Sequence, residues 1–125
     1  MKIEIKSWVN SEVLFSCEAK DMKEAILKAI KEKADLTSAD LRYADLTYAD
    51  LTSANLRYAN LTSANLRYAD LTSADLRYAN LTYADLTSAN LRYANLTSAD
   101  LTYANLTSAK GIFYFNFGVK IKVVK

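Results

Sequence analysis

The acidic side chains of this sequence are its first candidates for chemistry. Eight aspartates recur at multiples of five residues between positions 35 and 100, and seven asparagines fill the other positions of the same kind. Carboxylate and amide oxygens can hold Ca²⁺, but no segment has the spacing of an EF-type loop. A row of acids could instead imitate the charge of duplex DNA. We favour a plainer interpretation, in which these side chains are solvated or bond the turning backbone.

Residue types that other chemistries need are missing. The sequence has no histidine, which excludes Ser–His and Cys–His nucleophile systems and metal sites built on histidine. Cys17 is the only cysteine, so it has no internal disulfide partner. The only glycines, Gly111 and Gly118, form no phosphate-binding loop. We therefore expect a protein that is not an enzyme, with no catalytic residue, no cofactor and no metal site.

A repeat sets the elements that must position these side chains. From Ala34 to Ser108, fifteen consecutive units read Ala, Asp or Asn, Leu, Thr or Arg, Ser or Tyr. On an α-helix a five-residue step rotates the leucine by roughly 140°, so no apolar stripe forms. On a flat strand the odd step sends successive leucines to opposite faces. Only a chain that turns once per unit keeps every leucine inside, which predicts an all-β solenoid.

The predicted core is a column of leucines and a column of alanines on each side of the coil. The alanine two residues before each leucine shares its inward side, because side chains alternate along an extended segment. Burying one leucine side chain contributes about 1.5–3 kcal/mol before chain entropy is subtracted. The expected core leucines are Leu36, Leu41, Leu46, Leu51, Leu56, Leu61, Leu66, Leu71, Leu76, Leu81, Leu86, Leu91, Leu96, Leu101 and Leu106.

The run A-[DN]-L-x-x over residues 34–108 resembles the pentapeptide-repeat family. The resemblance implies a right-handed quadrilateral β-helix with four units per coil, with the leucine and the residue two before it inside. Natural members vary both inward positions, whereas here alanine and leucine are invariant. We interpret the sequence as an engineered consensus array, since repeat proteins are readily idealised.

Four units per coil place residues twenty apart on neighbouring coils. The arginines then scatter over all four sides instead of lining one groove, so we expect no nucleic-acid partner and only local packing of Arg and Tyr. Regular threonines can order water in ice-binding proteins, but this chain has no Thr-x-Thr. The expected neighbours are Arg57-Tyr58 with Arg77-Tyr78, Tyr48 with Tyr68, and Tyr83 with Tyr103.

The non-repeating N-terminal region, residues 1–33, is predicted to cap the solenoid. An uncapped solenoid exposes unpaired backbone and apolar side chains at its ends. Alternating residues predict a β-hairpin over 2–19, and apolar spacing predicts a short helix over 22–33. Asp21 is the expected N-cap of this helix, and Glu24 follows at the spacing of a capping box.

The β-helix is expected to span residues 34–109, and residues 110–125 are expected to form a C-terminal β cap. This cap combines an aromatic cluster with a strand that alternates apolar and lysine residues. The resemblance adds that the C-terminal coil of some relatives forms a two-fold dimer, so a homodimer through residues 111–124 is possible here. The expected capping aromatic residues are Phe113, Phe115 and Phe117.

Charge and hydropathy bound the function further. The net charge of +2 is too small to create the strongly positive surface potential that is typical of nucleic-acid-binding proteins. No apolar run is long enough to cross a bilayer. No signal peptide is evident at the start, so we expect no membrane partner and a cytoplasmic, soluble protein. The sequence predicts a non-catalytic structural scaffold that requires no partner. The alternative, which the resemblance suggests, is a DNA-mimicking module that binds a type II topoisomerase.

Overall fold

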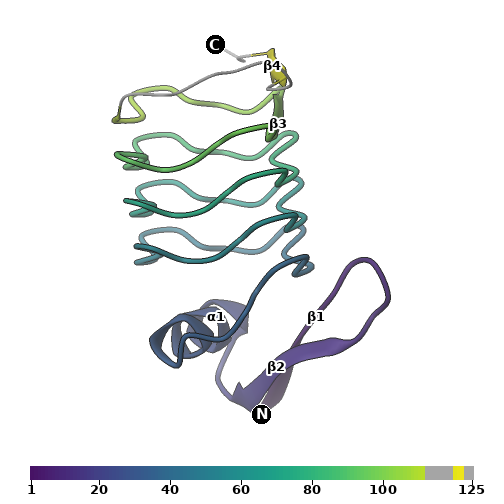
Figure 1. Cartoon of the computed structure of the whole chain (residues 1–125). Coiled ribbons are helices and arrows are strands. Elements are labelled where there is room, and N and C mark those ends of the chain that lie inside the picture. The colour runs from purple at the N-terminus through teal and green to yellow at the C-terminus, as the bar shows by residue number, and fades with distance from the viewer. Residues whose placement is uncertain (112–119, 123–125) are drawn as a thin grey trace.

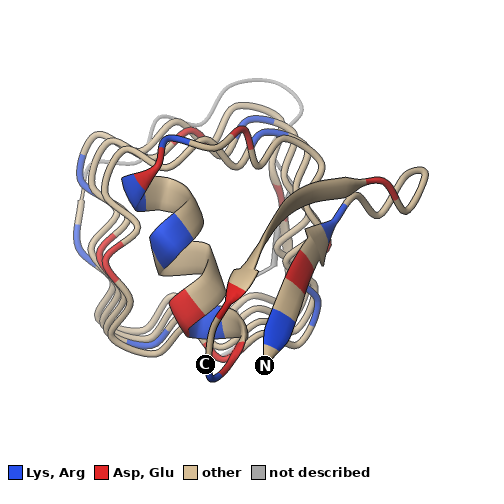
Figure 2. Cartoon of the chain, turned by 90° about the horizontal axis from the view of Figure 1, so that it is seen from below, with Lys and Arg blue, Asp and Glu red and all other residues tan. Residues whose placement is uncertain are grey.

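The computed structural model describes residues 1–111 and 120–122. The repeats form a stack of coils (Figure 1), which has a four-sided outline when seen along its axis (Figure 2). Parallel bridges join Asp/Asn positions twenty residues apart, beginning with Asp40 and Asn60 and ending with Asn90 and Lys110. One coil therefore takes four five-residue units, which is the expected register.

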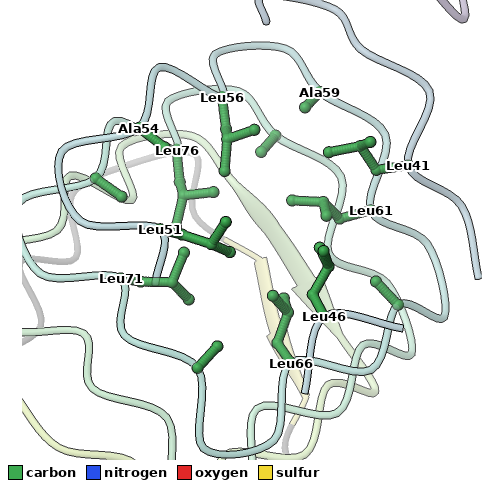
Figure 3. Close-up of a cluster of buried hydrophobic side chains, with 14 of the residues drawn as sticks. Leu41, Leu46, Leu51, Ala54, Leu56, Ala59, Leu61, Leu66, Leu71 and Leu76 are labelled. Atoms are coloured by element: carbon green, nitrogen blue, oxygen red, sulfur yellow. The ribbon is translucent and has the colours of Figure 1, made fainter. Parts of the chain in front are cut away.

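Leucine and alanine side chains fill the interior of the coils (Figure 3). The leucines from Leu36 to Leu101 are at most 2% exposed, while Leu106 in the last unit is only half-buried. The alanines from Ala39 to Ala104 are buried as well. Since each alanine precedes its leucine by two residues, a short extended segment sends both side chains to the same side.

Each unit ends in a tight turn that runs from the leucine to the next alanine. The alanine N–H donates to the leucine carbonyl three residues earlier, as Ala64 does to Leu61 at 3.0 Å. The third turn residue is always Ser or Tyr, and its φ lies between 57° and 64° in all fifteen units. A positive φ at this place is typical of type II turns, which usually carry Gly or Asn there. Left-handed backbone costs a residue with a Cβ about 1–2 kcal/mol, so packing elsewhere must offset that strain.

Every backbone N–H of the unit formed by residues 59–63 has a defined acceptor. The alanine donates within the turn, and the outward Thr or Arg donates to the Asp/Asn side chain two residues before it. The three other N–H groups donate to the coils above and below. In the unit of residues 59–63, the acceptors in chain order are Leu56 O, Ala39 O, Asn80 O, Asn60 Oδ1 and Thr82 O.

A β-hairpin is attached to one side of the first coil. Strands β1 (Lys2–Lys6) and β2 (Val13–Glu18) pair in antiparallel fashion, and the chain turns between them. The Asp40 N–H donates to the Lys6 carbonyl at 2.7 Å, and the Trp8 N–H donates to the Ser38 carbonyl at 3.0 Å. The hairpin thereby supplies the lower partner that this side of the first coil would otherwise lack.

Helix α1 (Met22–Lys31) lies across the N-terminal end of the coils (Figures 1 and 2). Its buried residues are Ala25, Ile26 and Ala29, on the same face of the helix. Asp21 is the N-cap, and its Oδ1 accepts from the Glu24 N–H at 2.8 Å. The Glu24 carboxylate reaches back to the Lys20 N–H at 2.6 Å, one residue before the N–H that a standard capping box uses.

The coil register continues beyond the last unit. Strand β3 (Asp100–Thr102) pairs in parallel with strand β4 (Lys120–Lys122), again twenty residues away. Gly111 occupies the position above Leu91, and a Cβ there would lie 2.8 Å from the Leu91 carbonyl carbon. Its φ of 133° also excludes most other residues. The expected capping residues Phe113, Phe115 and Phe117 lie outside the described residues.

Candidate functional site

The outward Asp and Asn side chains are the polar groups that recur most regularly on the coils. Their Oδ1 accepts a hydrogen bond from the backbone N–H two residues later, at 3.0 Å from Thr37 to Asp35 and at 3.1 Å from Thr62 to Asn60. Where that residue is Thr, its hydroxyl in most units also donates to the same oxygen, as Thr62 does at 2.6 Å. Asp and Asn are interchangeable in this role because both carry Oδ1. This bond satisfies the one N–H of the unit that does not donate to a backbone carbonyl.

How an arginine binds a carboxylate depends on whether its own unit carries Asp or Asn. Arg42 follows Asp40, and its Nε and terminal nitrogen donate to the two carboxylate oxygens at 2.8 and 2.6 Å. Arg77 donates to the two carboxylate oxygens of Asp75 in the same way, at 2.9 and 2.7 Å. Such a fork is the strong geometry of an Arg–carboxylate pair, although half-exposed pairs contribute little to stability.

Arg57 and Arg67 have asparagine in their own units and turn to the next coil instead. The Arg57 Nε lies 3.9 Å from Asp75 Oδ2, and the Arg67 Nε lies 3.9 Å from Asp85 Oδ2. The Arg57 Nε is buried and makes no hydrogen bond. Figure 2 shows basic and acidic residues around the whole outline of the coils, so these arginines form no continuous basic strip.

These contacts favour the ionised form of several carboxyl groups. The Thr hydroxyl two residues later lowers the pKa of its aspartate, and the backbone N–H of the same Thr adds to the effect, in Asp35, Asp45 and Asp50. The bound arginine side chain lowers the pKa of Asp40 and Asp75. All five groups are therefore charged at neutral pH and hold their turns as anions.

Among the described residues, three pairs of tyrosines stack between neighbouring coils, as the twenty-residue register predicts. The ring centroids are 4.8 Å apart in two pairs and 5.0 Å apart in the third, and the rings are within 11° of parallel. The spacing matches the separation of adjacent strands, because each ring leaves the coil from the same turn position. The pairs are Tyr48 with Tyr68, Tyr58 with Tyr78, and Tyr83 with Tyr103.

Two anchoring contacts have no signal in the sequence. The Trp8 indole N–H donates to the Tyr58 carbonyl at 2.7 Å, across fifty positions of the chain. The Lys23 ammonium donates to the Thr47 carbonyl at 2.7 Å, at the lower edge of the first coil. Both satisfy polar backbone atoms at the N-terminal end of the stack. No spacing rule connects either pair, and only the placement of the hairpin and of α1 brings them together.

No described constellation has the form of a reactive centre. Cys17 is a free, half-buried thiol on β2. Within residues 1–111 and 120–122, no three Asp, Glu or Cys side chains gather closely enough to hold a metal ion. In the same part of the chain, no helix is long and apolar enough to cross a membrane. What the described surface offers is an ordered lattice of turn-bound carboxylates, arginine forks and stacked phenol rings.

Comparisons with known proteins agree with this geometry. A family model described as pentapeptide repeats matches in eight copies, over residues 32–57, 54–92 and 79–110. No curated protein sequence gives a significant match.

Two solved structures resemble the chain closely. One is a pentapeptide-repeat protein from the thylakoid lumen of Arabidopsis thaliana, with 37% identity and a TM-score of 0.64 over 68% of this chain and 59% of that one. The other is a pentapeptide-repeat protein from Nostoc PCC 7120, with 35% identity and a TM-score of 0.66 over 78% of this chain and 94% of that one. This chain thus spans less than two thirds of the plant protein and nearly all of the cyanobacterial one. The repeat, the twenty-residue register and these matches together establish that the chain belongs to the pentapeptide-repeat family, whose members fold as right-handed quadrilateral β-helices.

Proposed function

We propose that this chain is a non-catalytic structural scaffold, an idealised pentapeptide array of engineered consensus sequence. The observation that carries the proposal is that three of the five positions in each unit are committed to the fold. Ala and Leu fill the core, the Asp/Asn oxygen holds the turn, and the N–H groups bond neighbouring coils. Only the two outward residues of each unit are left to meet a partner.

The invariance of the inward positions supports the engineered part of the proposal. Every unit from residue 34 to 108 carries the same alanine and the same leucine, and the outward pair takes only three forms. Many hydrophobic residues of similar volume would serve in such a core, so a sequence drifting under selection for folding would sample them. Absence of that variation is expected of a sequence written from a consensus.

The rival function, imitation of DNA towards a type II topoisomerase, would require acids that are free to meet the enzyme. In the array, five Arg against eight Asp leave a charge of only −3. Bridged Asp/Asn positions mostly pair Asp with Asn, and of those pairs only Asp50 with Asp70 sets two carboxylates against each other. Arg42 and Arg77 hold two more of the carboxylates directly. These features favour a scaffold over a DNA mimic.

A DNA gyrase supercoiling assay separates the two functions. The scaffold proposal expects unchanged supercoiling, and unchanged quinolone sensitivity, at protein concentrations up to a tenfold excess over enzyme. A matched variant replaces all eight array aspartates by asparagine, which keeps every Oδ1 acceptor while removing the negative charge. Inhibition by the parent chain that disappears in this variant would establish the DNA mimic and overturn the scaffold. Circular dichroism of both proteins checks that they share one fold.

A further inference from the structure

One column of turn residues on the coils is interrupted. Tyr43, Ser63, Tyr83 and Tyr103 follow one another at intervals of twenty residues, and the coil-to-coil bonds show that they are stacked. The Tyr43 N–H donates to Thr62 O at 3.0 Å, and the Ser63 N–H donates to Thr82 O at 2.9 Å. Their φ values lie between 58° and 61°, like those of the tyrosines that form stacked pairs. The Cα–Cβ bonds of the four residues therefore leave the coils in the same direction.

The serine leaves room for one ring in this column. Tyr83 stacks on Tyr103 at 5.0 Å on one side, but its neighbour on the other side is Ser63, whose side chain ends at a hydroxyl. Tyr43 stands one coil further on, about two strand spacings, or ~9.6 Å, from Tyr83. Complete pairs on other sides place a ring at every 4.8 Å. The space between Tyr43 and Tyr83, called here the Ser63 gap, is thus one ring wide.

The Ser63 gap has no counterpart elsewhere on the described array. In the columns that contain Tyr58 and Tyr78, or Tyr48 and Tyr68, the tyrosines are adjacent and the serines lie beyond them. The remaining column consists of Ser53, Ser73 and Tyr93 within the part of the chain that the structure describes. Within residues 1–111, only the Ser63 gap offers two ring faces to the same ligand.

The rings that border the gap are accessible, and their faces are electron-rich. Tyr43 is 75% exposed and Tyr83 is 58% exposed. The faces of tyrosine rings are electron-rich and attract cations. The neighbouring Arg42 is neutralised by its fork on Asp40, so it does not repel a cation from the gap. A flat, positively charged ring matches both the width and the polarity of this space.

We propose that the Ser63 gap binds one planar aromatic cation, sandwiched between Tyr43 and Tyr83 in place of the missing ring of the column. The ligand is a small molecule with a single flat, positively charged ring system. Binding is weak, in the millimolar range, because each exposed stacking or cation–π contact changes an equilibrium by only about two- to tenfold. The proposal does not depend on the scaffold role, since it concerns only the outward residues.

The test titrates the full chain with N-methylquinolinium and follows proton and ¹⁵N chemical shifts by NMR. Saturable shifts at Tyr43, Ser63 and Tyr83, larger than those at Tyr48 or Tyr58, are the expected result. Ser63→Tyr fills the gap and Tyr43→Ala removes one wall, and each should weaken binding by about fivefold or more. Ser88→Tyr is the matched control, because it adds a tyrosine at the same turn position but next to Tyr68, and it should bind as the parent does.

Several outcomes would overturn the proposal. Undiminished binding to Ser63→Tyr would show that the gap is not the site. Equal shifts at all tyrosine pairs would show general stacking on exposed rings. If uncharged quinoline at pH 8 binds as tightly as the cation, the positive charge of the ligand does not contribute to binding, and the proposed preference for a cation is wrong. Shifts at Tyr43 and Tyr83 that grow with protein concentration alone would identify a second copy as the occupant. Circular dichroism of each variant verifies that the coils persist.

Discussion

Replacement of Asp70 tests whether the turn-bonding oxygen is required by the fold. Asp70 Oδ1 accepts from the Thr72 N–H at 3.0 Å and also from the Thr72 hydroxyl, and both residues are half-buried. Asp70→Ala removes the acceptor and leaves a backbone N–H without a partner. Such a loss costs about 1–3 kcal/mol for a buried group, and partial access of water places the value here near the lower end, at about 1–2 kcal/mol.

Asp70→Asn is the matched variant because it keeps Oδ1 and removes only the charge. In the neighbouring coil the bridged residue is Asp50, and among the described bridges this is the one place where two aspartates face each other. Relief of this like-charge pair should leave the free energy of unfolding unchanged or raise it by a few tenths of a kcal/mol. Urea titrations followed by circular dichroism give both differences, with the m-value as a check that the exposed surface is unchanged.

Equal destabilisation by Asp70→Ala and Asp70→Asn would refute this reasoning, because the charge rather than the acceptor would then matter. No destabilisation by Asp70→Ala would refute it as well, since water would then serve the Thr72 N–H as effectively as the side chain does.

Three further predictions concern the same part of the array. In a denaturant titration, Leu71→Ala should lower the free energy of unfolding by about 2–5 kcal/mol, because burial is lost and a cavity forms. Thr72→Ala loses one half-exposed hydroxyl bond and should lower it by less than about 1 kcal/mol. Similar values for the two variants would contradict the inward placement of the leucines. Ser73 has a φ of 60°, where a β-branched residue is strained. Thermal melts should therefore show Ser73→Gly close to the parent in stability and Ser73→Val at least about 1 kcal/mol less stable. A Ser73→Val variant as stable as the parent would argue against the left-handed turn. The folded pKa of Asp75 lies below its unfolded value. Its contribution to stability is therefore complete above about pH 5 and is lost as the pH falls through the folded pKa. Asp75→Asn should narrow the difference in urea midpoint between pH 7 and pH 3, and an unchanged difference would count against this linkage.

The coil register could be predicted because it follows from the repeat and from one strong physical requirement. A leucine every fifth residue can be kept from water only if the chain bends once per unit, and the stacking of Tyr48 on Tyr68 follows once four units make a coil. Local sequence also indicated the polar role of Asp and Asn at the turn, since short polar side chains commonly bond nearby backbone.

The turn geometry and the anchoring contacts could not be predicted in the same way. Ser and Tyr carry no preference for a positive φ, so nothing in Ser63 or Tyr68 signals the left-handed backbone that the coil closure imposes on them. The bond from Trp8 to Tyr58 depends on how the hairpin docks, which is a tertiary property without a sequence period. The capping-box spacing identified Glu24, but its carboxylate reaches Lys20 because the preceding chain presents that N–H instead.

The uniform distance between bonded partners has a kinetic consequence. Coil-to-coil bonds of the array join residues nineteen or twenty-one positions apart, as in Leu61 with Asn80 and Asn60 with Ala39. The entropy lost in closing each loop is therefore the same for every coil, however many coils precede it. Folding can then advance along the chain as a zipper, each finished coil templating the next, and longer arrays built in steps of twenty residues should fold through the same elementary step.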